Sequence, residues 1–112
     1  MNIPEEILKA IKQVVMEEAE KLGVGVEKII LFGSRARGDY KEESDYDILI
    51  VVEGRIDRRR KIELNTRIGS RLIEILETPV DVVTVSESYW RKYHGVPGTI
   101  LYPASREGVV IA

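Results

Sequence analysis

The sequence predicts an α+β fold, a small mixed β-sheet flanked by helices. Apolar residues recur at helical spacing in two long segments, 3–23 and 57–76. Runs rich in β-branched residues occur between and after these segments, at 26–32, 46–53 and 80–85. The second of these runs contains five successive apolar residues, which is typical of a strand covered on both faces. We therefore expect three or four strands, with the helices to one side of the sheet.

The first long segment predicts one amphipathic helix, because its apolar residues fall on one helical face. Pro4 suits the first turn of this helix, and Gly23 suits its C-terminal cap. A short strand should follow from Val26 to Phe32, and Gly33 should end it. The apolar positions of the helix are Ile7, Leu8, Ile11, Val14, Val15 and Leu22.

A second long helix is predicted from Asp57 onward, packed on the sheet. Its apolar residues recur every four positions, and Pro79 helps to end it. These residues are Leu64, Ile68, Leu72 and Leu76. After the third strand, Ser86 fits the N-cap of a short helix over residues 87–95.

The signal weakens toward the end of the sequence. Residues 99–108 have helical character, but Pro103 lies within this segment and should break or kink a helix there. Residues 109–112, "VVIA", predict a last short strand.

The composition narrows the class of protein. At 112 residues we expect one domain, 1–112, large enough to bury a core without disulfides. The sequence contains no cysteine, which excludes disulfides and thiolate zinc sites. The acidic first residues do not fit a secretory signal, and no apolar run approaches the roughly 20 residues that span a bilayer. We expect a cytoplasmic protein with no membrane contact, and its net charge of -2 argues against direct nucleic-acid binding.

Two aspartates, Asp45 and Asp47, stand at the start of the second strand. Residues i and i+2 of an extended chain project to the same side, so the two carboxylates should lie a few ångströms apart. Crowded carboxylates repel each other unless a metal or a basic group compensates. Hard oxygen ligands favour Mg²⁺ or Mn²⁺ over zinc, so the pair predicts a divalent-cation site.

A third carboxylate, Asp81, lies within the otherwise apolar third strand. An isolated acid is costly to bury, so its position requires a partner. If the third strand lies beside the second, Asp81 joins the pair as a third ligand. The alternative is that Asp81 forms a structural ion pair with an arginine.

The turn at Gly33 and Ser34 could hold a triphosphate. Glycine permits unusual backbone angles and the close approach of a ligand, and serine offers a hydroxyl and an N–H. Arg35 and Arg37 add positive charge, either as phosphate ligands or as exposed loop charges. The basic run 55–61 is either the solvated start of the second helix or a contact for a partner or RNA.

The combination of Gly33-Ser34, ten residues, and Asp45-Tyr46-Asp47 before an apolar strand, with Asp81 on a later strand, closely resembles the DNA polymerase beta superfamily of nucleotidyltransferases. The stretch "GSRARGDYKEESDYDILIVV" is most similar to the minimal nucleotidyltransferase (MNT) subfamily of prokaryotes. The resemblance implies a nucleotidyltransferase fold and Mg²⁺-dependent transfer of AMP from ATP, with two metal ions. It also implies that the three aspartates bind the metals, while Gly33 and Ser34 hold the triphosphate.

The resemblance further implies a partner protein. Minimal nucleotidyltransferases of this kind are paired with a helical HEPN toxin and act as its antitoxin, in some cases by attaching AMP to a tyrosine of the toxin. The residues leave open whether Asp81 acts as a general base or only binds metal, and whether antitoxin action requires catalysis or only stoichiometric binding. Transfer to RNA or to a small molecule is disfavoured, because the 112 residues offer no further domain for such an acceptor.

Overall fold

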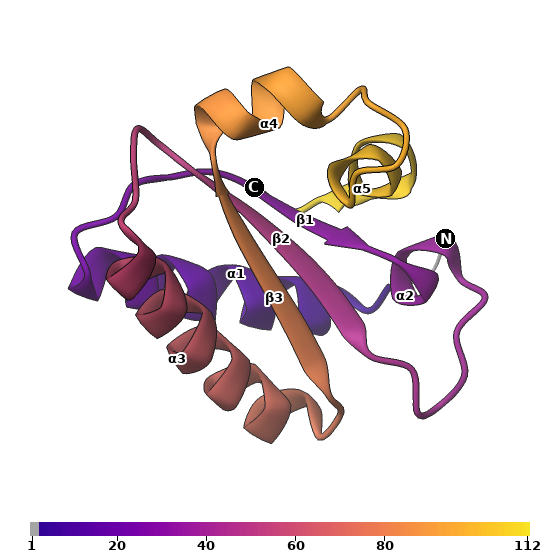
Figure 1. Ribbon diagram of the computed structural model, residues 1–112. Helices are drawn as coiled ribbons and strands as arrows, with labels where there is room; N and C mark the ends of the chain where they lie inside the picture. The colour runs from indigo at the N-terminus through magenta and orange to yellow at the C-terminus, as the bar shows by residue number, and fades with distance from the viewer. Residues whose placement is uncertain (1–2) are drawn as a thin grey trace.

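The computed structural model describes residues 3–112 and contains a four-stranded sheet with helices on both of its faces (Figure 1). Met1 and Asn2 lie outside the described residues. They begin the segment in which we expect no secretory signal. In chain order the elements are α1 (Glu5–Lys21), β1 (Val26–Phe32), α2 (Ser34–Arg37), β2 (Tyr46–Val52), α3 (Arg58–Leu76), β3 (Val80–Ser86), α4 (Glu87–Tyr93), α5 (Leu101–Glu107) and β4 (Val109–Val110).

The sheet is mixed, as predicted. Its strand order is β3-β2-β1-β4. Strand β1 pairs antiparallel with both β2 and β4, whereas β2 and β3 run parallel. Helix α3 is the crossover that allows the two parallel strands to start at the same end of the sheet.

The expectation that the helices lie to one side of the sheet is wrong. Helices α1 and α3 cover one face, where their buried residues pack with alternate residues of the strands (Figure 1). Helices α4 and α5 cover the other face through Trp90, Leu101 and Ala104. Because both faces are covered, the continuous apolar run of β2 is buried on both sides, as its composition predicts.

The ends of the helices follow the local sequence. The Asp57 carboxylate accepts a hydrogen bond from the backbone N–H of Arg60, and the Ser86 hydroxyl accepts one from the backbone N–H of Tyr89. Pro103 does not break α5, because it is the third residue of that helix. The first four N–H groups of a helix have no partner within it, so a missing N–H costs little there.

A buried carboxylate joins α1 to α3. The Glu18 side chain is 2% exposed and accepts hydrogen bonds from Arg67 Nε at 2.7 Å and Arg71 Nη1 at 2.9 Å. Lys21 Nζ lies 3.3 Å from the same carboxylate. The hydrogen bond from Arg67 is the largest of the effects that lower the pKa of Glu18 to about 2.

Within residues 3–112, no helix is both long enough and apolar enough to cross a membrane.

Candidate active site

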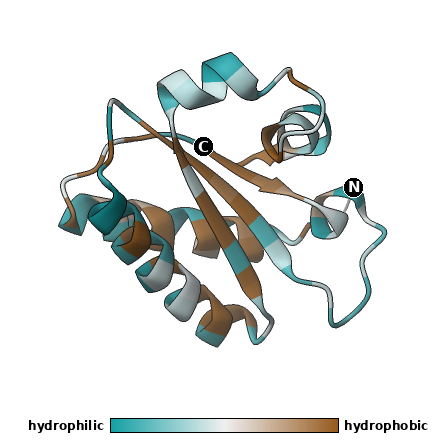
Figure 2. Ribbon diagram, viewed as in Figure 1, coloured by the Kyte–Doolittle hydropathy of each residue, from teal (hydrophilic) through white to brown (hydrophobic). Residues whose placement is uncertain are grey.

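Two of the three candidate aspartates lie side by side on adjacent strands. Asp47 of β2 and Asp81 of β3 are direct partners in the parallel register. Their strands begin with Tyr46 and Val80, so both carboxylates lie near the same end of the sheet. Figure 2 shows hydrophilic segments near this end of two strands that are otherwise mostly hydrophobic. The condition that the third strand lies beside the second is therefore met.

The third carboxylate, that of Asp45, precedes β2 in an exposed position. Its charge still acts on Asp47. Burial is the largest cause that raises the pKa of the Asp47 carboxyl, followed by the negative charges of Asp81 and Asp45, while Arg37 opposes them. The three acids thus form one electrostatic cluster that favours a cation.

Gly33 is required by its contact with Asp47. Its φ of 76° lies in the left-handed region, which side chains other than glycine rarely adopt. A Cβ atom built on Gly33 would collide with Asp47 Oδ2. Gly33 of the Gly-Ser turn and Asp47 of the aspartate pair, which we considered together because of their spacing, are therefore in direct contact.

Arg37 lies close to the aspartates. Its guanidinium is held by Asp39 Oδ2 at 3.3 Å and by Glu107 Oε2 at 3.4 Å, yet 42% of its side chain remains exposed. Since Glu107 belongs to α5, this contact also links α2 to α5. The guanidinium remains accessible to an anionic ligand beside Asp47.

Arg35 has a different environment. Its guanidinium donates to the carbonyl oxygens of Ser44 and Glu42, at 3.0–3.2 Å. It also stacks on Tyr40 and Tyr46, with its Cζ atom 4.3 and 4.5 Å from the two ring centroids. In this structure Arg35 holds the loop that leads to Asp45, a role that we did not predict. No periodicity or motif marks such contacts in a sequence.

The donor chemistry of the cluster suits a hard divalent cation, because all three acids offer carboxylate oxygens. The partial burial of Asp47 between two further negative charges also suits one. The positions of these side chains fit a cation less well than their chemistry does. No set of three His, Cys, Asp or Glu side chains within residues 3–112 is close enough together to hold a metal ion. A cation held by all three acids would therefore require their side chains to come closer together than they are here.

The fold and this cluster define the class of protein. The chain belongs to the family of the nucleotidyltransferase domain, whose model matches residues 8–101. It is similar to "Putative protein adenylyltransferase MJ0604" of Methanocaldococcus jannaschii, with 53% identity over 60 residues, which cover 54% of this chain and 58% of that protein. The chain thus spans less than two thirds of the length of this relative.

Solved structures with the same fold agree with the family. A "putative nucleotidyltransferase" from Sulfolobus solfataricus shares 28% identity and a TM-score of 0.58, over 94% of this chain and 78% of that chain. The MNT antitoxin complex with the tri-AMPylated HEPN toxin of Shewanella oneidensis shares 18% identity and a TM-score of 0.56, over 98% of this chain and 72% of that chain. The second likeness concerns the fold alone.

Proposed function

We propose that this chain is an Mg²⁺-dependent nucleotidyltransferase that transfers AMP from ATP to a tyrosine hydroxyl of a HEPN toxin and so acts as its antitoxin. The observation that carries the proposal is the pairing of Asp47 with Asp81 across β2 and β3, with Gly33 packed against Asp47. This arrangement lies at one end of the sheet, where Asp81 is exposed and Asp47 is half-buried. It suits a reaction that needs positioning and charge neutralisation more than a protein nucleophile.

The residues of the chain have separate roles in this proposal. Asp45, Asp47 and Asp81 would hold the metal, and Gly33, Ser34 and Arg37 would bind the triphosphate. Bound Mg²⁺ would neutralise charge on the phosphates and lower the pKa of the attacking hydroxyl. From the sequence, Arg35 is either a phosphate ligand or an exposed loop charge. In this structure its guanidinium donates to carbonyl oxygens of the loop before Asp45, and its role toward phosphate stays a prediction.

The proposed reaction balances without a further reactant. The tyrosine oxygen bonds to the α-phosphorus of ATP, and the bond from this phosphorus to the oxygen bridging toward the β-phosphate breaks. Pyrophosphate leaves, and the hydroxyl proton passes to Asp81 or to solvent. Asp81 is exposed at the end of the sheet, where an acceptor hydroxyl can reach it.

The choice of acceptor is supported by the names of the similar proteins. The relative from Methanocaldococcus jannaschii is designated as a protein adenylyltransferase, and the Shewanella oneidensis structure contains an AMPylated HEPN toxin bound to an MNT antitoxin. A protein acceptor also fits a chain whose net charge of -2 offers no general attraction to nucleic acid.

Label transfer tests the proposal. The tagged chain is isolated from its native lysate with its bound partners and incubated with α-labelled ATP and Mg²⁺. Wild type should label a co-purifying protein on tyrosine, and the Asp45→Asn/Asp47→Asn variant should not. Label on RNA would replace the proposed acceptor.

The same experiment separates catalysis from simple binding. If the partner co-purifies equally with both forms and neither transfers label, the chain neutralises its partner stoichiometrically. In that case the double variant should also protect cells from the toxin, because asparagine has nearly the same shape as aspartate and scarcely alters the outer surface.

A further inference from the structure

We propose that the free edge of β3 is the docking site for the acceptor segment, which adds to the sheet as an extended strand and presents its tyrosine to Asp81. This inference rests on the proposed function and names the form in which the acceptor binds. It also predicts a sequence pattern around the modified tyrosine.

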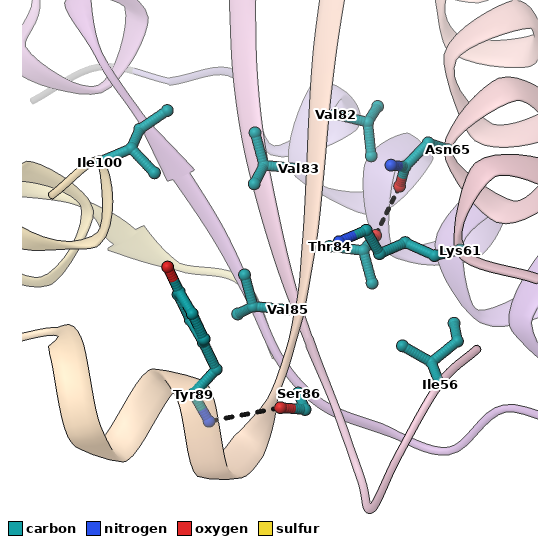
Figure 3. Close-up of a pocket in the computed structure, with 10 residues that line it drawn as sticks. All are labelled: Ile56, Lys61, Asn65, Val82, Val83, Thr84, Val85, Ser86, Tyr89 and Ile100. Atoms are coloured by element: carbon teal, nitrogen blue, oxygen red, sulfur yellow. Dashed lines mark hydrogen bonds between the residues drawn. The ribbon is translucent and has the colours of Figure 1, made fainter. Parts of the chain in front are cut away.

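A groove of about 460 Å³ runs along β3 (Figure 3). Residues Val82 to Ser86 form its floor. Lys61 and Asn65 of α3 form one wall, and Tyr89 of α4 with Ile100 forms the other. Its size is within the range of about 300–1,000 Å³ that is typical of ligand pockets. None of the three aspartates lines this groove, so it is separate from the site described above.

The floor of the groove offers backbone hydrogen bonds. Strand β3 is at the edge of the sheet, and within residues 3–112 no strand pairs with its outer side. An extended peptide can use such an edge by forming main-chain hydrogen bonds, while pockets on either side select alternate side chains.

Thr84 on the floor of the groove is only 1% exposed and its hydroxyl donates a hydrogen bond to Asn65 of the wall, whereas the other floor residues are half-buried. The strand edge has side chains on both of its sides, so one extended segment would contact both walls with its alternate side chains. This favours a peptide as the occupant.

The two walls differ in chemistry, and this sets the side chains of the occupant. In Figure 3, Tyr89, Ile100, Val83 and Val85 lie on one side of β3, and Lys61 and Asn65 lie on the other. The first wall is apolar, and Tyr89 and Ile100 are 48% and 50% exposed. On the second wall, no acidic side chain of the described chain forms an ion pair with Lys61. Alternating apolar and acidic residues therefore match this groove.

The position of Asp81 connects the groove to the reaction. Asp81, Val83 and Val85 are alternate residues of β3 and so share one face of the sheet. An occupant paired along Val82–Ser86 would place its next residue beside Asp81. The tyrosine should thus be followed or preceded by apolar residues at two and four positions, with acidic residues between them.

Binding of short peptides tests the docking site. The probes are acetyl-Tyr-Glu-Ile-Glu-Ile-amide and its reversed sequence, because the direction of pairing is part of the question. Both are compared with the versions in which lysine replaces glutamate. Binding is measured without nucleotide or Mg²⁺, so it does not depend on transfer. One acidic peptide should bind wild type and slow hydrogen exchange of the β3 amides, and the lysine peptides should bind more weakly.

Variants test the walls of the groove. Lys61→Glu should weaken binding of the acidic peptide by at least about threefold and favour the lysine peptide instead. Lys12→Glu is the matched control, because Lys12 is exposed on α1 and its substitution changes the net charge equally. Equal binding of the acidic peptide to wild type and to Lys61→Glu, or unchanged exchange of the β3 amides, would overturn the docking site.

Failure of this inference can be distinguished from failure of the proposed function. If wild type binds the acidic peptide as described but labels no protein with AMP, the groove is a docking site and the transfer reaction is wrong. If wild type and Lys61→Glu label the partner protein at the same rate, the transfer reaction stands and the docking site is wrong.

Discussion

At the scale of single residues, Gly33 connects the turn to the aspartates. A side chain there would be strained by the positive φ and would collide with Asp47. We expect Gly33→Ala to lower the free energy of unfolding by about 1–3 kcal/mol. It should also reduce AMP transfer, because Asp47 must move. Urea unfolding and the labelling assay measure the two effects, with Gly98→Ala as the control, since Gly98 also has a positive φ but no neighbour within 4 Å. Full activity of Gly33→Ala would show that this contact has no role in the site.

Arg35 should stabilise the loop before Asp45. Lysine in its place keeps the charge but loses the planar fork that reaches two carbonyl oxygens and stacks on two tyrosines. We expect Arg35→Lys to lower the free energy of unfolding by about 1–2 kcal/mol and to speed hydrogen exchange in residues 39–45. Arg58→Lys, an exposed exchange at the start of α3, should have no such effect. Unchanged exchange in the loop would contradict this role.

Residue spacing indicates where the aspartates lie, but it does not indicate what Arg35 contacts. The i, i+2 spacing of Asp45 and Asp47 just before an apolar run, and the isolated acid in the otherwise apolar third strand, are visible in the sequence. The contacts of Arg35 depend on how a loop of eight residues folds back between α2 and β2. Nothing in the order of those residues reveals that geometry.

At the scale of elements, the carboxylate of Glu18 fixes α1 against α3. Replacing Glu18 with glutamine removes the negative charge of the group that accepts hydrogen bonds from Arg67 and Arg71. We expect Glu18→Gln to lower the free energy of unfolding at neutral pH by about 1.5–3 kcal/mol. Glu20→Gln, an exposed change on the same helix, is the control and should be close to wild type.

The effect of Glu18 should depend on pH in one direction. Its pKa is lowered from 4.5 to about 2 in the folded protein, so the stabilisation is complete above pH 4.5 and is lost as the pH falls toward 2. The difference in unfolding free energy between wild type and Glu18→Gln should therefore shrink over this range. A difference that stays constant from neutral pH to about 2 would show that the ionised carboxylate is not its cause.

The two long helices can be predicted from periodicity, whereas the shorter elements depend on composition or on single residues. Both long helices extend over enough residues to show helical periodicity, while the first strand follows from its β-branched and aromatic residues. Helix α2 has four residues, about one turn, and was predicted only as a Gly-Ser turn. For α5, the effect of Pro103 depends on where the helix begins, and the sequence does not indicate that start.

At the scale of the whole molecule, the strand order brings two candidate site residues together. Asp47 and Asp81 are 34 positions apart in sequence, and only the parallel pairing of β2 with β3 makes them neighbours. The sequence predicted the strands but left their order conditional, because pairing depends on long-range contacts. The same limit explains why the placement of α4 and α5 on the second face was not predicted.

We propose that the Asp47–Asp81 pair catalyses nucleotidyl transfer. The most direct measurement is the rate of AMP transfer from α-labelled ATP to the purified partner toxin by wild type, Asp81→Asn and the control Glu43→Gln, an exposed acid of the loop before Asp45. We predict that Asp81→Asn lowers the rate at least about 100-fold and that Glu43→Gln leaves it unchanged. Transfer by Asp81→Asn at the rate of wild type would contradict the account.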